Sequence, residues 1–249
     1  MPVERSQGVS APDEMFNELT QSICPKCLKP IDARLLMMDG RVVMQKTCER
    51  HGRFEALVSS DSEMYVNSLR YNKPGTAPLK YSTSAVDGCP LDCGLCPEHI
   101  QHTCLALIEI NSHCNLDCPV CFADAQPGFS LSMGQVGRML DTFVELEASP
   151  EVVQFSGGEP TIHPEILPML RLAVEKGIEL VMLNTNGLRI ARDDRFLDGL
   201  AEVGPTVYLQ FDGVTAQTHR LMRGEDLLTA KLRALDRLAE AGLDAVLVP

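Results

Sequence analysis

Ten cysteines are the feature that most restricts how this chain can fold, because all of them lie between Cys24 and Cys121. In a small secreted chain such a count would indicate disulfides. Here the first residues, MPVERSQGVSAPDEM, are polar and lack the apolar core of a signal peptide. In the cytoplasm thiols stay reduced, and clustered cysteines there are typically metal ligands. We therefore expect a cytoplasmic, metal-binding protein.

The distribution of charge excludes one class of function. Of the 34 acidic and 22 basic residues, 21 acidic and 11 basic ones lie in residues 101–249, which gives this part a net charge of −10. An acidic surface does not neutralise phosphates, so broad nucleic-acid binding is not expected. No stretch approaches the roughly 18 apolar residues of a transmembrane span. Peripheral contact with a membrane surface remains open.

The first cysteine set consists of two short knuckles at the base of a predicted hairpin. Between them, Asp39-Gly40 separates two apolar runs, which is typical of a two-residue turn because both positions favour positive φ. The spacing C-x2-C-x20-C-x2-H is the layout of zinc ribbons and rubredoxins, and three cysteines with one histidine are an accepted zinc combination. We expect one iron or zinc ion bound by Cys24, Cys27, Cys48 and His51.

The second set follows a segment rich in Pro, Gly and Ser, residues 73–88, which is typical of a linker. Its spacing is C-x3-C-x2-C-x7-C, and it supplies enough thiolates to complete a [4Fe–4S] cluster or a zinc site. The ligands would be Cys89, Cys93, Cys96 and Cys104. His99 and His102 are expected on the surface rather than on the metal.

After Cys104 the chain alternates between strands and helices. Such alternation predicts parallel βαβ units and an α/β sheet or barrel. Strands are expected at 105–110, 152–155, 179–183, 206–211 and 243–248, and helices at 131–147, 164–176, 194–203 and 226–241. No helix follows the last strand, so we expect a barrel truncated at the C-terminus and a chain that continues past Pro249.

The sequence thus predicts four regions. Residues 1–20 are expected to form a polar tail with a short helix near Met15, and residues 21–72 a small metal module. Residues 73–104 are expected to hold the linker and an auxiliary cluster, and residues 105–249 the α/β core.

A third cysteine set directly follows the first strand of this core. In parallel α/β folds ligands bind at the carboxyl ends of strands. Cys114, Cys118 and Cys121, spaced C-x3-C-x2-C, present three thiolates from one loop, which suits an iron–sulfur cluster or zinc. A four-iron cluster with three protein ligands leaves one iron free to bind a small molecule.

Together with Gly157-Gly158-Glu159-Pro160 after the next strand, this loop resembles that of the radical S-adenosylmethionine (SAM) enzymes. The resemblance implies a partial, TIM-like βα barrel and a [4Fe–4S] cluster held by the three cysteines. SAM would bind the open iron, and one electron, from a donor such as ferredoxin or flavodoxin, would cleave it. The products would be methionine and a 5′-deoxyadenosyl radical that abstracts hydrogen from substrate.

The same resemblance implies further contacts with SAM. The backbone of Gly157 and Gly158 and the region of Glu159 would meet its amino group. Phe122 would pack on adenine, and the ribose and carboxylate contacts would come from Asn186, Gln210 and Asp212, although ordinary turn chemistry explains these three equally well. The run His219, Arg220 and Arg223 is expected to be solvated, with Arg223 as a weaker candidate for the SAM carboxylate.

The order of all cysteine motifs resembles a radical SAM subgroup that contains tetraether lipid synthase and proteins described as dihydropterin methyltransferases. This implies an auxiliary [4Fe–4S] cluster, a rubredoxin-like metal site and carbon–carbon bond formation at an unactivated C–H bond. The substrate would be a lipid chain or a pterin-like small molecule. Two other functions remain open. An iron–sulfur electron-transfer protein would have four ligands at every cluster and would not need the Gly157–Pro160 motif. A zinc-binding scaffold protein would bind zinc alone.

Overall fold

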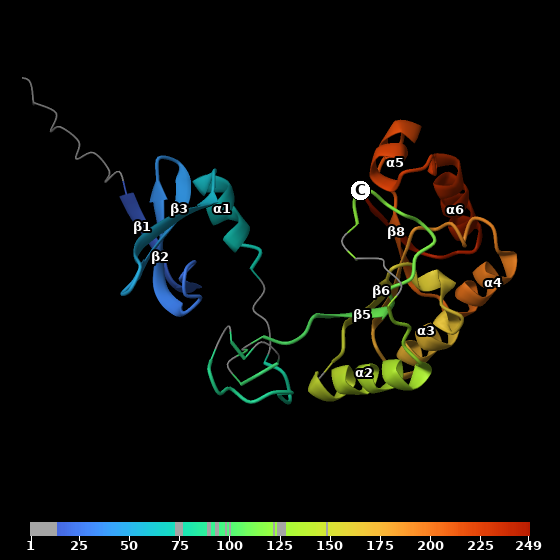
Figure 1. Ribbon diagram of the computed structural model, residues 1–249, viewed down its shortest axis with the longest axis horizontal. Coiled ribbons are helices and arrows are strands. Elements are labelled where there is room, and N and C mark those ends of the chain that lie inside the picture. Colours follow the sequence, from blue (N-terminus) through green and yellow to red (C-terminus); the bar gives the residue numbers. More distant parts are fainter. Residues whose placement is uncertain are drawn as a thin grey trace, which may run out of the picture. The chain divides into compact units, whose positions relative to one another are not determined.

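The computed structural model describes residues 14–72, 77–88, 91–92, 95–97, 99, 101–121, 123, 128–147 and 149–249. The chain divides into two compact units. The first comprises the described residues within Met1–Thr76 and Ser82–Ile100, and the second those within Ala77–Tyr81 and Gln101–Pro249. Figure 1 shows an antiparallel sheet in the first unit and a sheet with helices in the second.

The first unit is built on a four-stranded antiparallel sheet in the order β1-β2-β3-β4. The predicted hairpin is confirmed, because Met38 pairs with Arg41 across Asp39 and Gly40, whose φ values are 49° and 72°. A short helix follows the sheet, capped by the Asp61 side chain. The elements are β1 (Glu14–Ile23), β2 (Pro30–Met38), β3 (Arg41–Cys48), β4 (Gly52–Ser59) and α1 (Ser62–Leu69).

The short helix predicted near Met15 is wrong, because this segment is strand β1. The strand pairs antiparallel with β2 from Glu14↔Met38 to Ile23↔Pro30. Its backbone donors and acceptors are therefore satisfied by a neighbouring strand, and this tertiary pairing overrides local propensity. The last residues of the polar tail expected at 1–20 therefore belong to a strand, which begins at Glu14.

The second unit is an α/β fold, as predicted. Its sheet is wholly parallel, in the order β5-β6-β7-β8-β9. Ser132 caps α2 in a reciprocal capping box with Gln135, and Gly204 ends α4 with a φ of 72°. The elements are β5 (Leu105–Asn111), α2 (Met133–Leu146), β6 (Val152–Gly157), η1 (Pro160–Ile162), α3 (Ile166–Glu175), β7 (Leu180–Thr185), α4 (Asp194–Val203), β8 (Thr206–Gln210), α5 (Ala216–Arg223), α6 (Leu228–Glu240) and β9 (Ala245–Val248).

The two faces of this sheet differ in polarity. Successive residues of a strand point to opposite faces. One face carries Ile108, Phe155, Leu183 and Leu209, which form the core with buried side chains from α2, α3, α4 and α6. The alternate positions line a cavity at the carboxyl ends of the strands and include Glu109, Gln154, Ser156, Asn184 and Gln210. The sheet therefore has an apolar side under its helices and a mixed side toward the cavity, where these polar residues lie beside apolar ones such as Leu107.

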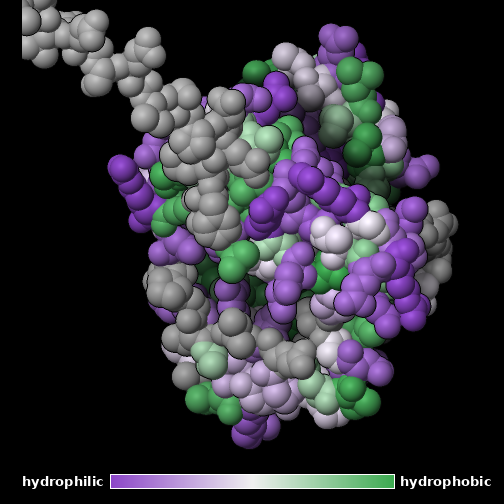
Figure 2. Space-filling view, turned by 90° about the vertical axis from the view of Figure 1, so that its left-hand side faces the viewer, coloured by the Kyte–Doolittle hydropathy of each residue, from purple (hydrophilic) through white to green (hydrophobic). Residues whose placement is uncertain are grey.

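Among the described residues, no helix is both long and apolar enough to cross a membrane. The first unit exposes single apolar side chains, among them Leu19, Met64 and Tyr71. Figure 2 shows one face of the molecule, on which hydrophobic groups are interspersed with hydrophilic ones. Scattered exposed apolar residues of this kind are ordinary on protein surfaces.

Candidate metal centre and cysteine-lined cavity

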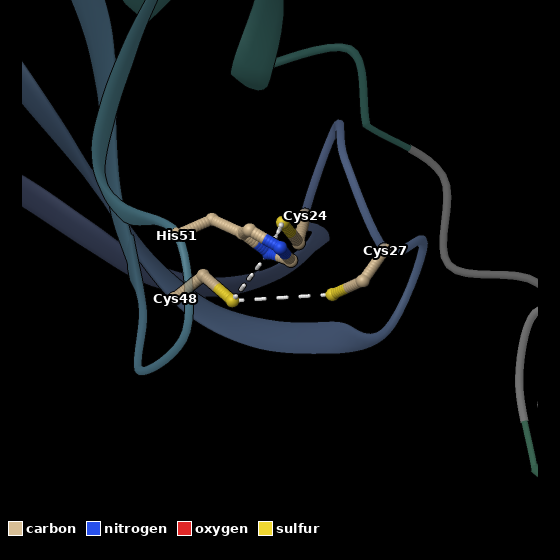
Figure 3. A group of neighbouring side chains, drawn as sticks. All are labelled: Cys24, Cys27, Cys48 and His51. Carbon is tan, nitrogen blue, oxygen red and sulfur yellow. Dashed lines mark hydrogen bonds between the residues drawn. The ribbon is translucent and has the colours of Figure 1, made fainter.

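The first cysteine set converges on one point of the first unit. In Figure 3 the side chains of Cys24, Cys27, Cys48 and His51 point toward one another, and their donor atoms all lie within 4.8 Å of each other. The Sγ atoms of Cys27 and Cys48 are 3.9 Å apart, and His51 Nδ1 lies 3.4 Å from Cys24 Sγ. A tetrahedral ion with sulfur bonds of about 2.3 Å sets its sulfurs about 3.8 Å apart. The set therefore fits a single tetrahedral metal ion.

The backbone of the first knuckle forms a tight loop that favours the thiolate form of Cys24. The Cys24 N–H donates to Lys29 O at 2.9 Å, which closes a tight loop, and Leu28 within it has a φ of 59°. Burial alone would raise the pKa of the Cys24 thiol. Hydrogen bonds from the backbone of Cys27 and Lys26 and from the neighbouring thiols outweigh that effect and hold the pKa at about 6. A thiol that ionises this readily is a ready metal ligand.

Two members of the second set, Cys89 and Cys93, lie outside the described residues. Of the other two, Cys96 is buried and Cys104 is exposed. The Asp92 carboxylate accepts the backbone N–H groups of Val86, Asp87 and Gly88, each at 2.7 Å, and these hydrogen bonds lower its pKa. The segment that leads into this set is thus folded onto an aspartate within it. The auxiliary cluster stays a prediction.

The third set lines the cavity at the strand ends of the second unit. This cavity measures about 400 Å³, and Cys114, Cys118 and Cys121 form part of its wall. Burial raises the pKa of the Cys114 thiol, and the charges of Glu159 and Cys118 add to that rise. Three thiols on one loop beside an open cavity are a donor set that fits a cluster with one free iron. Phe122, predicted to pack on adenine, lies outside the described residues.

The two glycines at the end of β6 lie very close to the segment that leads into the cysteine loop. A Cβ on Gly157 would lie 2.2 Å from Asn111 O, and one on Gly158 would lie 2.2 Å from His113 O. Gly158 N–H donates to Asn111 O and Glu159 N–H to His113 O, both at 2.8 Å. Glycine is therefore required here by the approach of β6 to the loop before Cys114, whether or not the backbone also contacts SAM.

The carboxylate of Glu159 is buried and ties two strand ends together. Its Oε1 accepts the N–H and hydroxyl of Thr161 at 3.0 and 2.6 Å and the Thr185 hydroxyl at 2.7 Å. Its Oε2 accepts the Asn186 N–H at 2.8 Å. Glu159 is only 1% exposed. These contacts already use most of its accepting capacity, so its first role is to hold the ends of β6 and β7 in register.

The three residues predicted to contact the ribose and carboxylate of SAM all line the cavity, and all have partners within the protein. Asn186 Nδ2 donates to Asn115 Oδ1 at 2.7 Å, which links β7 to the cysteine loop. Gln210 Nε2 donates to Asn184 Oδ1 at 3.3 Å. Asp212, whose φ is 58°, has its carboxylate held by Arg223. Their roles toward SAM stay predictions.

The expectation of a solvated run after β8 is wrong for two of its three residues. His219 is fully buried, with Nε2 3.0 Å from Gly213 O, because α5 packs it beneath the strand end. The side chain of Arg223 is 16% exposed and faces Asp212. Arg220 is exposed and pairs with Asp226, as expected of a surface charge.

Sequence reasoning missed Lys231, which is fully buried in α6 and whose ammonium donates to Gln210 O. Burial lowers its pKa to about 8, although the charge of Asp212 acts in the opposite direction. A signal was present in the sequence. Lys231 lies on the stripe Leu227, Ala234 and Leu238, which is otherwise apolar at helical spacing. A lysine on such a face indicates a buried charge that needs partners.

Comparison with known proteins decides the family. The sequence profile of the radical SAM superfamily matches residues 108–248, which is more than half of the chain. The chain belongs to the radical SAM superfamily. The fold of the second unit agrees with this, and membership implies a [4Fe–4S] cluster and SAM as cofactors. A second profile, of the HMPTM N-terminal zinc ribbon domain, matches residues 16–60, which contain the four converging ligands.

Two curated relatives have names that specify a pterin and GTP. The chain is 37% identical over 235 residues to 7,8-dihydro-6-hydroxymethylpterin dimethyltransferase of Methanocaldococcus jannaschii, a match that covers 92% of this chain and 46% of that protein. It is 30% identical over 142 residues to GTP 3′,8-cyclase of Actinobacillus pleuropneumoniae serotype 3, with 54% and 40% covered. The chain thus spans less than half the length of each relative.

A solved structure confirms the fold. Streptococcus suis SuiB bound to its precursor peptide SuiA superimposes with a TM-score of 0.50 at 20% sequence identity, and the match covers 59% of this chain and 33% of that chain.

Proposed function

We propose that the protein containing this chain is a radical SAM enzyme that methylates a pterin-like small molecule at carbon. The observation that carries the proposal is the cavity that Cys114, Cys118 and Cys121 line together with residues at the carboxyl ends of the parallel strands. When bound, the cluster would supply the electron that cleaves SAM to methionine and a 5′-deoxyadenosyl radical, and this radical would take a hydrogen atom from the substrate carbon. A separate methyl donor and a second electron would then complete the new carbon–carbon bond. The electron would come from a donor such as ferredoxin or flavodoxin.

The chain's own residues hold and shape this site. The cysteine loop is anchored to β6 through Gly158 and Glu159 and to β7 through Asn186. Each anchor comes from the carboxyl end of a different strand, so the sheet fixes the loop from two sides. A thiolate set held in this way keeps three iron ligands in place and leaves the cavity side for SAM.

Polar side chains on the sheet side of the cavity support a heterocycle as the substrate. Its sheet face presents the side chains of Gln154, Ser156, Asn184 and Gln210 and the carboxylate of Glu109. Amides, hydroxyls and carboxylates can orient a ligand rich in hydrogen-bonding groups, and the apolar residues beside them, among them Leu107 and Leu116, can pack on a flat ring. A pterin, with its ring nitrogens, amino group and carbonyl, matches such a surface. The names of both curated relatives, which specify a pterin and GTP, support the same class.

Anaerobic assay of the intact protein tests the proposal. With SAM, a reductant, a methyl donor and 7,8-dihydro-6-hydroxymethylpterin, we expect 5′-deoxyadenosine and a pterin of increased mass. Replacement of Cys114, Cys118 and Cys121 by Ala should abolish both products, while Cys96→Ala should leave SAM cleavage detectable. If no 5′-deoxyadenosine forms under any reducing condition, the proposed radical SAM activity is refuted. SAM cleavage stimulated by a lipid chain and not by the pterin would refute the substrate class.

For the other metal sites we propose zinc at the first set and a closed [4Fe–4S] cluster at the second. The four converging donors of the first set and the name of the matched ribbon domain support zinc. The four cysteines Cys89, Cys93, Cys96 and Cys104 provide enough thiolates for a cluster with no open iron. Metal and sulfide analysis of anaerobically purified protein distinguishes these assignments, because iron at the first set would give a rubredoxin-like visible spectrum.

A further inference from the structure

The guanidinium of Arg223 connects the end of β8 to the cysteine loop. Its Nε lies 3.0 and 2.9 Å from the two carboxylate oxygens of Asp212, and its Nη2 donates to Gln210 Oε1 at 3.0 Å. The remaining nitrogen, Nη1, points to Cys118 Sγ at 3.9 Å. The planar fork of an arginine is rigid, so fixing two of its nitrogens also fixes the third.

The backbone places α5 against the same loop independently of this side chain. Arg223 is the last residue of α5, and Gly224 ends the helix with a φ of 81°. A Cβ on Gly224 would lie 3.5 Å from Asp117 O and 3.6 Å from Pro119 Cδ, the residues on either side of Cys118. The helix end and the loop are therefore in near contact, and the guanidinium lies where they meet.

Arg223 shares its carboxylate partner with other basic groups, so its positive charge is not fully balanced by Asp212. The side chain of Asp212 is 1% exposed, and besides Arg223 it faces His219 Nδ1 at 3.8 Å from Oδ2. Lys231 contributes a second positive charge near Asp212. One carboxylate is thus shared among several basic groups. Because Nε and Nη2 contact the carboxylate, Nη1 presents the outward edge of the cation to Cys118.

We infer that Arg223 is a positioning residue that donates a charge-assisted hydrogen bond to the Cys118 thiolate and thereby raises the reduction potential of the cluster held by Cys114, Cys118 and Cys121; this inference rests on the proposed function. A reduced cluster carries one more negative charge than an oxidised one. A fixed cation that donates to a ligand sulfur stabilises the reduced form more, and hydrogen bonds to sulfur are among the groups that set cluster potentials.

Redox titration of the intact protein, reconstituted anaerobically and studied without SAM, tests the inference. The EPR signal of this cluster is identified as the one that changes when SAM is added to a parallel sample. At the wild-type midpoint potential, Arg223→Gln should lower the ratio of reduced to oxidised cluster by roughly tenfold, equivalent to about 59 mV for one electron. Arg223→Lys keeps the charge opposite Asp212 and should shift the ratio in the same direction by less.

Arg220→Gln is the matched control, because Arg220 lies one turn earlier on α5 and pairs with the exposed Asp226. It should leave the midpoint unchanged. A second measurement is ENDOR spectroscopy of the reduced cluster in H2O and in D2O. A proton coupling that is seen in H2O and lost in D2O should be present in wild type and absent in Arg223→Gln. Because SAM is absent, a contact between Arg223 and the SAM carboxylate would alter neither measurement.

Unshifted midpoints in both Arg223 variants, or an equal shift in Arg220→Gln, would overturn the inference. If Arg223→Gln does not retain the cluster, the midpoint potential of the cluster in Arg223→Lys alone tests the inference. A wild-type protein without any SAM-responsive cluster would overturn the proposed function and this inference with it. A normal wild-type cluster with unshifted variants would overturn only the inference.

Discussion

At the residue scale, Glu159 is a buried carboxylate whose oxygens accept hydrogen bonds from Thr161, Thr185 and Asn186. In Glu159→Gln an amide group replaces one oxygen, so at least one buried donor loses its acceptor. An unsatisfied buried group costs about 1–3 kcal/mol, and we expect the free energy of unfolding to fall by that amount. Chemical denaturation measures it. Glu165→Gln is the control, because Glu165 is exposed and its side chain makes no capping hydrogen bond. Equal stability of both variants would contradict the role of Glu159.

Lys231 gives stability a defined dependence on pH. Burial lowers its pKa in the folded protein from 10.5 to about 8. Between these values the unfolded chain binds more protons than the folded chain, so the free energy of unfolding rises with pH, by up to about 1.4 kcal/mol per pH unit. We expect the Tm of wild type, relative to that of Lys231→Met at the same pH, to rise as the pH increases through this window. A constant difference between the two proteins would show that Lys231 titrates normally.

At the scale of elements, the close contact between β6 and the cysteine loop depends on two glycines. In Gly158→Ala the new methyl group would meet His113 O at 2.2 Å, so the loop that carries Cys114 must move. We expect loss of iron from this set, measured as iron and sulfide per protein and as the SAM-responsive EPR signal. Gly134→Ala in α2 is the control, because its nearest neighbour would be Arg138 Nη1 at 3.7 Å, an ordinary contact. Full cluster occupancy in Gly158→Ala would show that the loop tolerates displacement.

The sequence predicts the elements of the second unit where apolar periodicity is strong and fails where it is weak. All five strands and the helices α2, α3, α4 and α6 have periodic or continuous apolar runs and are found where expected. Helix α5 was missed because its residues are mostly polar and only His219 is buried. Its signals were its caps, Thr215 and Gly224.

Prediction of the candidate site has the same limit. The cysteine sets are visible because their members are close in sequence and share one chemistry. The partners of Glu159 at β7 and of Cys118 on α5 are far along the chain and are joined only by the fold. Spacing alone therefore predicts candidate metal ligands but not the side chains that contact them from distant parts of the chain.

At the scale of the whole molecule, the two units should respond differently to loss of metal. The sheet of the first unit has a small core, in which Leu35, Leu36 and Val42 are buried, as are the candidate ligands Cys24 and Cys48. Zinc binding in ribbons and fingers contributes about 10–16 kcal/mol, more than a core of this size provides. The second unit has an extensive core of its own. The first unit should therefore depend on its metal for folding, and the second should not.

Hydrogen exchange read peptide by peptide tests this dependence in the intact protein. In Cys48→Ser, one of four metal ligands is lost, and we expect fast exchange throughout β1 to β4 with unchanged protection in β6, β7 and α3, because the core of the second unit contains none of these ligands. Glu49→Gln changes the neighbouring exposed residue of the same knuckle and should match wild type in both units. Protection of β2 and β3 that survives in Cys48→Ser would mean that the sheet is stable without its metal. Fast exchange in both units would mean that the metal centre supports the α/β fold as well, which the separate cores do not predict.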